Sequence, residues 1–182
     1  RMLRDKQPVM QGLKGYDDSV IPQVINAVLC GHNIIILGER GQGKSRIIRG
    51  LVEFLDEYIP AIAECPIHDN PFAPACSQCR MRSEEMGDRL PIAWIPRDRR
   101  LVEKLATSDI STADLIGEID PIRVAEGRTL DDEAAIHFGL VPRANRGIFA
   151  INELPDLAEK IQVSLFNVME ERDLQIKGFP VR

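Results

Sequence analysis

The sequence lacks the features that would place it in a membrane, in the secretory pathway or on nucleic acid. No apolar run approaches the roughly 20 residues that a membrane-spanning helix needs, and no signal peptide opens the chain. The formal net charge is −5, so the surface as a whole is not built to bind nucleic acid. We find no internal repeat and no low-complexity tract. These absences favour a cytoplasmic protein and argue against a membrane or a nucleic acid as its partner.

The composition is sufficient for one domain with an appendage. The chain has 182 residues, of which 44% are hydrophobic, so it can bury a core. Residues 1–15 are mixed and basic, and we expect them to form an N-terminal arm beside a core of residues 16–182. Because the first residue is Arg1 and not Met, we expect the numbering to start inside a longer protein.

The most informative stretch is Gly38–Ser45, which reads G-x-x-x-x-G-K-S, the pattern of a phosphate-binding P-loop. Its glycines let backbone N–H groups turn toward phosphates, Lys44 reaches the β- and γ-phosphates, and the Ser45 hydroxyl ligates Mg²⁺. A buried strand over 33–37 and a helix that Pro60 ends supply the flanks that this motif requires. The predicted nucleotide-binding residues here are Gly38, Glu39, Arg40, Gly41, Gln42, Gly43, Lys44, Ser45 and Arg46.

A helix over about 20–30 is predicted before the P-loop strand. Ile21, Val24 and further apolar residues share one face, and Gly31 suits the position just after the helix. Tyr16 and Val20 are candidates for an adenine pocket, and ordinary packing is the alternative. We expect Cys30 to be a small buried apolar residue.

Further elements follow from apolar runs and turn residues. Strands are predicted over 91–95 and 147–151, and a short helix over 99–105. The polar segment 121–146 is typical of an insertion with a hairpin and a short helix. A second long helix opens at Pro155.

Asn152 and Glu153 directly follow the strand at 147–151. A P-loop needs an acid at the end of a neighbouring strand to orient the attacking water, and Glu153 is the only acid at this strand end. We therefore interpret Glu153 as catalytic together with Lys44. The alternative is a surface glutamate that caps the next helix.

Three of the four cysteines lie in a proline-rich segment at 61–90. Cys65, His68, Cys76 and Cys79 give two pairs with two-residue spacing, the arrangement of a tetrahedral Zn²⁺ site. The alternative is a loop that carries reduced thiols. His32 and His137 stand alone, and we expect them to be structural or solvated.

Taken in order, these motifs resemble the ATPase subunit of magnesium chelatase and its AAA+ relatives, including MoxR-type ATPases and chelatase-like proteins labelled sigma-54-interacting regulators. The resemblance rests on the P-loop, on Asp114–Asp120 (DLIGEID), on Gly139–Gly147 (GLVPRANRG) and on the Glu-bearing strand, and it covers roughly residues 15–182. It implies an α/β fold: an αβα AAA+ core with a parallel sheet and a hairpin inserted in the second helix, here truncated before the later strands and the helical lid.

The resemblance also implies a function. Such proteins bind ATP and Mg²⁺, assemble into rings with copies of themselves and use ATP hydrolysis to remodel a client protein, which the sequence does not name. Arg143 and Arg146 either face a neighbouring subunit or lie in a solvated turn. Where the family has Asp-Glu at the end of its Walker B strand, this chain has Asn152-Glu153, so Asn152 would hold Mg²⁺ through water and with less charge. The chain also lacks the Gly-Ala-Phe-Thr-Gly-Ala loop with which sigma-54 activators grip their target.

Two rival functions remain from the sequence. A nucleotide-dependent switch with little hydrolysis is compatible with Asn152. A P-loop small-molecule kinase would need a cationic lid and an acceptor pocket, which residues 121–146 do not obviously provide.

Overall fold

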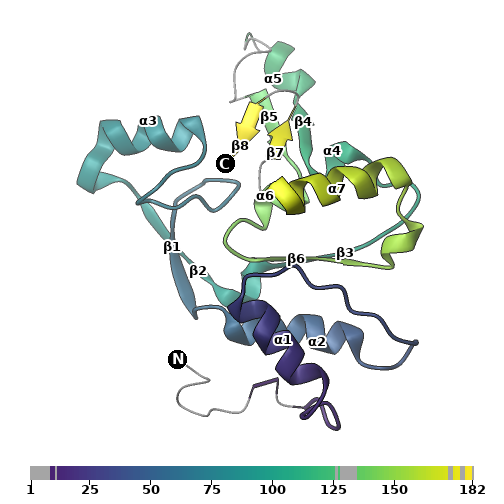
Figure 1. The fold of residues 1–182 in the computed structure, drawn as a ribbon. Coiled ribbons are helices and arrows are strands. Elements are labelled where there is room, and N and C mark those ends of the chain that lie inside the picture. The colour runs from purple at the N-terminus through teal and green to yellow at the C-terminus, as the bar shows by residue number, and fades with distance from the viewer. Residues whose placement is uncertain are drawn as a thin grey trace. The chain divides into compact units, whose positions relative to one another are not determined.

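The computed structural model describes residues 9–10, 12–125, 127, 135–171, 174–176 and 179–181. The chain divides into two compact units, Arg1–Asp56 and Glu57–Arg182. Figure 1 shows the helices and strands of each unit along the chain. Within the described residues, the longest helices are too short or too polar to cross a bilayer.

The first unit contains helix α1 (Val20–Leu29), helix α2 (Lys44–Gly50) and the 3-10 helix η1 (Leu51–Phe54). The predicted helix before the P-loop is confirmed as α1, which buries Ile21 and Val24. Gly31 follows it with φ 66°, the left-handed conformation that ends many helices. The prediction that Cys30 is buried is wrong: it is exposed at the C-cap, beyond the buried face of the helix.

The described part of the N-terminal arm packs against α2 and η1. Met10 and Leu13 are among the buried apolar residues of the chain. The Met10 N–H donates to Glu53 Oε2 at 2.9 Å, and Arg46 Nη1 donates to the Gly12 carbonyl at 3.0 Å. These contacts join residues of the arm to the helix that carries the end of the P-loop.

Two predictions for the first unit and its end are wrong. Residues 33–37 form no strand with any described residue, and Ile35 and Leu37 are 67% and 88% exposed. A strand needs hydrogen-bonding partners, and an apolar sequence alone does not provide them. The predicted helix after the P-loop ends at Phe54 and not at Pro60, because Tyr58–Ile62 pairs as a strand.

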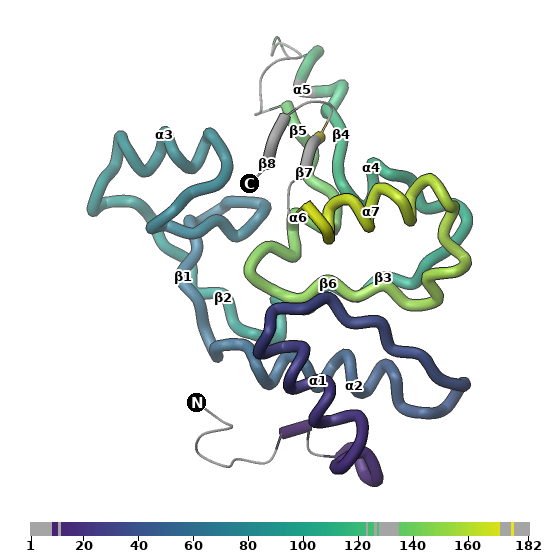
Figure 2. The backbone as a smooth tube through the Cα atoms, in the orientation of Figure 1, coloured from purple at the N-terminus to yellow at the C-terminus, as the bar shows by residue number. Residues whose placement is uncertain are grey.

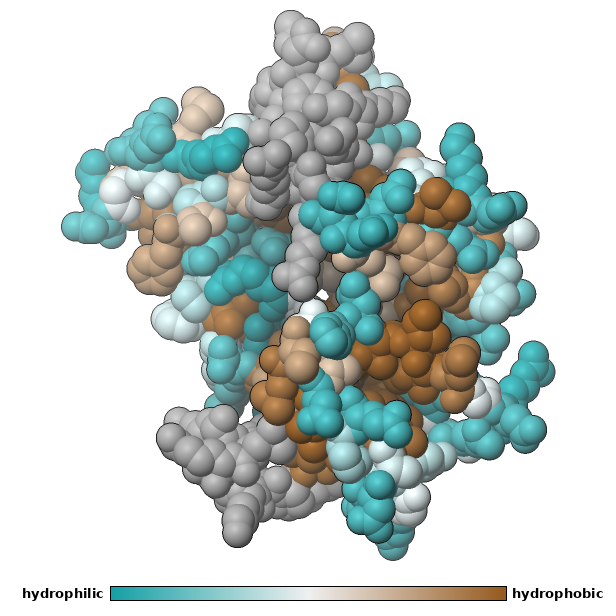
Figure 3. Space-filling view, in the orientation of Figure 1, coloured by the Kyte–Doolittle hydropathy of each residue, from teal (hydrophilic) through white to brown (hydrophobic). Residues whose placement is uncertain are grey.

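The second unit begins with an antiparallel ladder of β1 (Tyr58–Ile62) and β2 (Ile92–Pro96). The connection between these strands carries helix α3 (Ser77–Met86) and the 3-10 helix η2 (Gly87–Arg89). Side chains over α3 are mostly hydrophilic in Figure 3, in keeping with its arginines and glutamates. The predicted strand at 91–95 is therefore confirmed, and the cysteine-bearing segment forms the end of a long hairpin (Figure 1).

A parallel pair of strands forms the part of the sheet that the fold prediction anticipated. After the 3-10 helix η3 (Arg97–Arg100), β3 (Leu101–Leu105) pairs in parallel with β6 (Ile148–Asn152), and the two run side by side in Figure 2. The helix predicted over 99–105 is wrong, because strand pairing with β6 overrides local helical spacing. A side chain at Gly147 would overlap the Arg100 carbonyl, so glycine permits the close approach at the start of the pair.

The remaining elements surround these strands. A hairpin is present, as predicted, but it begins before the polar segment 121–146: β4 (Gly117–Ile119) pairs antiparallel with β5 (Ile136–Phe138). The shorter elements are α4 (Thr112–Leu115), α5 (Pro121–Ala125), α6 (Leu140–Arg143), η5 (Leu154–Asp156), β7 (Leu174–Ile176) and β8 (Phe179–Val181), the last two paired antiparallel. Pro155 opens η5, and the long helix α7 (Glu159–Glu171) starts after it.

One apolar core joins the elements of the second unit. Leu115 from α4, Phe138 from β5, Leu165 from α7 and Ile62 from β1 belong to a single buried cluster. The cysteines at 65, 76 and 79 belong to the same cluster. The cysteine-bearing segment is therefore part of the core of the unit and not a separate appendage.

Candidate functional site

The P-loop leads directly into helix α2 in the first unit. Gly41 and Gly43 have φ angles of 84° and 74°, which only glycine adopts without strain. Gly43 is the N-cap of α2, and its carbonyl accepts the Ile47 N–H at 3.0 Å. The alternation of left-handed glycines with other residues turns consecutive N–H groups to one side, the arrangement that binds anions.

The ammonium of Lys44 folds back over this loop. Its Nζ donates to the Gly38 carbonyl at 2.6 Å and to the Glu39 carbonyl at 2.8 Å. Two of the three donors of the ammonium group are thus directed at backbone oxygens, and a phosphate oxygen would offer a stronger, charged acceptor. Ser45 is exposed beside Lys44, so its hydroxyl is accessible to a cation.

Two further contacts hold the loop. Gln42 Oε1 accepts the Glu39 N–H at 2.9 Å, and the Tyr16 hydroxyl donates to the Gln42 carbonyl at 2.9 Å. Of the two residues predicted for the adenine pocket, the structure brings Tyr16 to the P-loop and places Val20 at the start of α1. The side chain of Arg46 reaches Gly12 in the arm.

The second predicted part of the site lies at the end of β6, in the second unit. Asn152 Nδ2 donates to Glu103 Oε1 at 2.7 Å across the parallel pair. Because the NH₂ group is directed at this carboxylate, the amide oxygen is directed away from it. Glu103 was missed by the sequence reasoning, because the prediction of a helix over 99–105 hid its place beside Asn152.

Glu153 follows as the first residue outside the strand. It is exposed and has a left-handed backbone with φ 55°, and its carbonyl accepts the Asp156 N–H at 2.9 Å. Such a conformation costs a non-glycine residue about 1–3 kcal/mol and is enriched at functional sites. It turns the chain sharply from β6 into η5 and leaves the carboxylate in solvent.

The two arginines of the GLVPRANRG stretch are held differently. Arg143 is exposed, and its Nη2 lies 3.2 Å from His137 Nε2. Arg146 is half-buried, and its Nη1 donates to the Pro60 carbonyl at 2.7 Å. Arg146 therefore ties the turn before β6 to strand β1.

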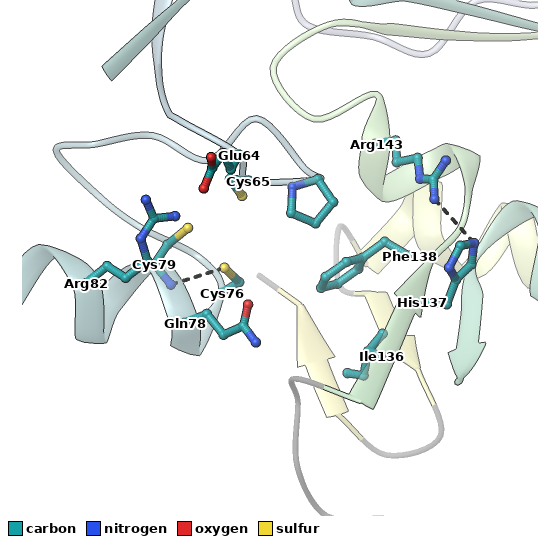
Figure 4. A pocket seen from close by; sticks show the side chains of 11 residues that line it. Glu64, Cys65, Cys76, Gln78, Cys79, Arg82, Ile136, His137, Phe138 and Arg143 are labelled. Atoms are coloured by element: carbon teal, nitrogen blue, oxygen red, sulfur yellow. Dashed lines mark hydrogen bonds between the residues drawn. The ribbon is translucent and has the colours of Figure 1, made fainter. Parts of the chain in front are cut away.

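The structure gathers three cysteines and an aspartate at the end of the β1–β2 hairpin. The ligand atoms of Cys65, Asp69, Cys76 and Cys79 all lie within 4.8 Å of one another, and all four residues are buried. Figure 4 shows the three thiols converging on one side of a pocket. The predicted ligand His68 is not in this group: its backbone is left-handed, with φ 49°, and its side chain is only half-buried.

Hydrogen bonding and burial separate the pKa values in this cluster. A hydrogen bond from the Cys76 thiol lowers the pKa of Cys65, against the opposing effect of burial, and the same bond with burial raises the pKa of Cys76. Burial raises the pKa of Cys79 to about 12. Burial, and then the charge of Arg146, lower the pKa of His68.

The comparisons with known proteins agree with this arrangement. No family model matches the chain. It is 32% identical over 146 residues to a magnesium-chelatase subunit ChlI from Chlorella vulgaris, over 75% of this chain and 36% of that protein. It is 34% identical over 142 residues to a magnesium-chelatase 67 kDa subunit from Heliobacterium mobile, over 75% of this chain and 20% of that protein. The chain thus spans well under half the length of these relatives.

A solved structure shares the fold. A chain in a structure of the complex between subunits BchI and BchD of magnesium chelatase matches with a TM-score of 0.59 and 24% identity, over 89% of this chain and 48% of that chain. The fold is therefore the mixed α/β fold of that chain, and it carries a P-loop that leads into α2. Over three quarters of its length, the chain is similar in sequence to subunits of magnesium chelatase.

Proposed function

We propose that this chain is the nucleotide-binding core of an AAA+ ATPase that hydrolyses ATP to ADP and phosphate. The observation that carries the proposal is the P-loop, with left-handed Gly41 and Gly43 before α2 and with Lys44 turned over the loop. The cofactors are ATP and Mg²⁺, with Ser45 as a direct ligand of the ion. Glu153 orients the attacking water, and Asn152 accepts a hydrogen bond from a metal-bound water.

We also propose that the full protein acts as a ring of identical subunits and remodels another protein. The relatives support this part: one solved neighbour belongs to a complex between two magnesium-chelatase subunits. The chemistry of the site does not identify the client. A cytoplasmic location is proposed because the described cysteines are free thiols, as in a reducing compartment.

The test is the substitution Lys44→Ala. The ammonium then no longer reaches the phosphates, and the two backbone carbonyls that it contacted lie in an exposed loop where water replaces it. We expect ATP affinity to fall about 10- to 100-fold, the value of one or two charge-assisted hydrogen bonds, with little change in thermal stability. Calorimetric titration with ATP measures the affinity.

Lys14→Ala is the matched control, because it removes the same charge from an exposed position in the same unit. It should leave ATP affinity unchanged. If Lys44→Ala binds ATP as tightly as the parent, the P-loop is not the nucleotide site. Phosphate release without any acceptor distinguishes an ATPase from a kinase.

A second candidate function is a nucleotide-dependent switch that hydrolyses ATP very slowly. The observation that favours it is Asn152, whose amide is occupied by Glu103 at the position where the related proteins are expected to carry an aspartate. Turnover of the full-length protein at saturating Mg²⁺ separates the two functions: a switch releases phosphate no faster than its Glu153→Gln variant.

A further inference from the structure

The cysteine cluster is assembled by three separate pieces of backbone. Cys65 follows strand β1, Asp69 lies in the loop after it, and Cys76 and Cys79 are the N-cap and a first-turn residue of α3. The four side chains are 7%, 1%, 5% and 2% exposed, in that order. Four side chains that carry metal-binding atoms therefore converge in a buried position that no step of ATP hydrolysis uses.

The carboxylate of Asp69 is fixed by the backbone around it. Its oxygens accept the N–H groups of Asn70 at 3.0 Å, Ala75 at 2.8 and 2.9 Å, and Cys76 at 3.0 Å. These three donors make four contacts, two to each oxygen, because the Ala75 N–H is shared between both oxygens. A cation at one oxygen would take the place of one of the two contacts that the shared Ala75 N–H makes. The Cys79 N–H donates to Cys76 Sγ at 3.4 Å, which orients that sulfur in the same way.

The cluster concentrates negative charge away from water. Asp69 and Cys79 lie close together, since their ligand atoms are within 4.8 Å of each other and both side chains are buried. Burial of an uncompensated carboxylate is costly, and the hydrogen bonds that the structure shows to it come from neutral backbone groups. A bound divalent cation would compensate this charge and the thiolates together.

We propose that Cys65, Cys76, Cys79 and one oxygen of Asp69 bind a structural Zn²⁺ ion. Binding replaces three thiol protons, which are released, so the ion and its four ligands carry a net charge of −2. Arg82 and Arg143 line the pocket that the three cysteines also line, and in Figure 4 Arg82 lies near Cys79 whereas Arg143 turns toward His137.

Geometry and ligand chemistry select zinc. Sulfur ligands about 2.3 Å from a tetrahedral ion lie about 3.8 Å apart, so the observed spacing of up to 4.8 Å closes with shifts of about 1 Å or less. Three thiolates favour Zn²⁺ over Mg²⁺ or Ca²⁺, which prefer oxygen ligands. With four protein ligands the site is closed, as structural zinc sites are, and it ties the loop after β1 to α3.

The experiment measures zinc in the full chain purified without added metal. We expect about one Zn²⁺ per chain in the parent, in Cys30→Ser and in His68→Ala, and loss of stoichiometric zinc in Cys79→Ser and Asp69→Asn. Cys30→Ser is the matched control, because it is the same substitution at an exposed cysteine outside the cluster. A zinc-free parent overturns the site, and loss of zinc in His68→Ala overturns the ligand set.

A second measurement tests the ligand set without removing a ligand. With Co²⁺ in place of Zn²⁺, the parent should show thiolate-to-metal charge transfer from three Co–S bonds, and Asp69→Cys should show the larger absorbance of four. Equal absorbance in the two proteins overturns the assignment of Asp69. In the zinc-loaded parent, a thiol reagent should modify Cys30 alone, and all four cysteines after chelation; four reactive thiols before chelation overturn the proposal.

Discussion

The contact between Asn152 and Glu103 predicts that the substitution Asn152→Asp destabilises the protein, whereas the sequence alone suggests that this substitution is beneficial. Restoring the usual acid with Asn152→Asp ought to help bind Mg²⁺, since it adds a negative charge at the end of β6. In the structure, however, the amide donates to a half-buried carboxylate at 2.7 Å. The substitution replaces that bond with two facing carboxylates, a repulsion of about 4 kcal/mol at 4 Å in a surface-like dielectric.

Relaxation and proton uptake reduce this cost. A pair of close carboxylates keeps one proton, so the pKa of one of them should rise above its ordinary value. What remains at neutral pH is the loss of a hydrogen bond to a charged group, about 2 kcal/mol. For a chain of this size that lowers the melting temperature by about 4–8 °C. Because the raised pKa belongs to the folded state, the loss of stability of Asn152→Asp relative to the parent should be smallest at acidic pH and should grow as the pH rises.

The assay is a double-mutant cycle by thermal unfolding with Asn152→Asp, Glu103→Gln and the double variant. The double variant exchanges acid and amide, so the hydrogen bond is restored in the opposite direction and most of the stability should return. It also leaves a full charge at the end of β6, and the Mg²⁺ concentration for half-maximal ATPase rate should fall below that of the parent. Two results would contradict this reasoning: Asn152→Asp alone is as stable as the parent at neutral pH, or the double variant is no more stable than Asn152→Asp. Either result would mean that the hydrogen bond between Asn152 and Glu103 does not stabilise the protein.

Two further predictions concern other carboxylates. In the full-length protein, Glu153→Gln should bind ATP but hydrolyse it at least tenfold more slowly than the parent. The control Glu159→Gln, at the exposed start of α7, should retain the parent rate. If Glu153→Gln releases phosphate as fast as the parent, Glu153 has no role in catalysis. Hydrogen bonds from the Ser111 backbone and hydroxyl hold the pKa of Asp114 below its ordinary value. The capping box therefore stabilises the fold when the pH is above the ordinary pKa of an aspartate. This stabilisation is lost as the pH falls through the lowered pKa of Asp114. In Ser111→Ala, carboxyl NMR titration should show the pKa of Asp114 rising toward the ordinary value, and an unchanged pKa would contradict the capping geometry.

The features that the sequence predicted well are those that depend on neighbouring residues. The P-loop is defined within Gly38–Ser45, and its glycines have the backbone angles that the motif requires. Helix α1 shows its buried face in the spacing of Ile21 and Val24. In both cases the information lies within one or two turns of chain, so no distant partner decides the outcome.

The strands that were missed or misplaced depend on distant partners. Leu101 and Leu105 are four residues apart, which fits a helix, and no two apolar residues of this segment alternate as in a half-buried strand. Pairing with Ile148–Asn152 selects the strand. The prediction for the apolar run at 33–37 is wrong in the opposite sense: its residues favour a strand, but no described strand pairs with it. Only knowledge of the pairing would have placed Glu103 beside Asn152.

The choice between His68 and Asp69 shows the same limit within a single loop. Two-residue spacing predicts a pair of metal ligands where the chain forms a helical turn, as at Cys76 and Cys79 at the start of α3. The segment after Cys65 is not helical: Glu64 and His68 have φ angles of 65° and 49°. A left-handed residue redirects the chain, so the residue that follows it, Asp69, carries its side chain into the cluster. The motif thus predicted a cluster of possible metal ligands, and the backbone conformation decided which of two adjacent side chains belongs to that cluster.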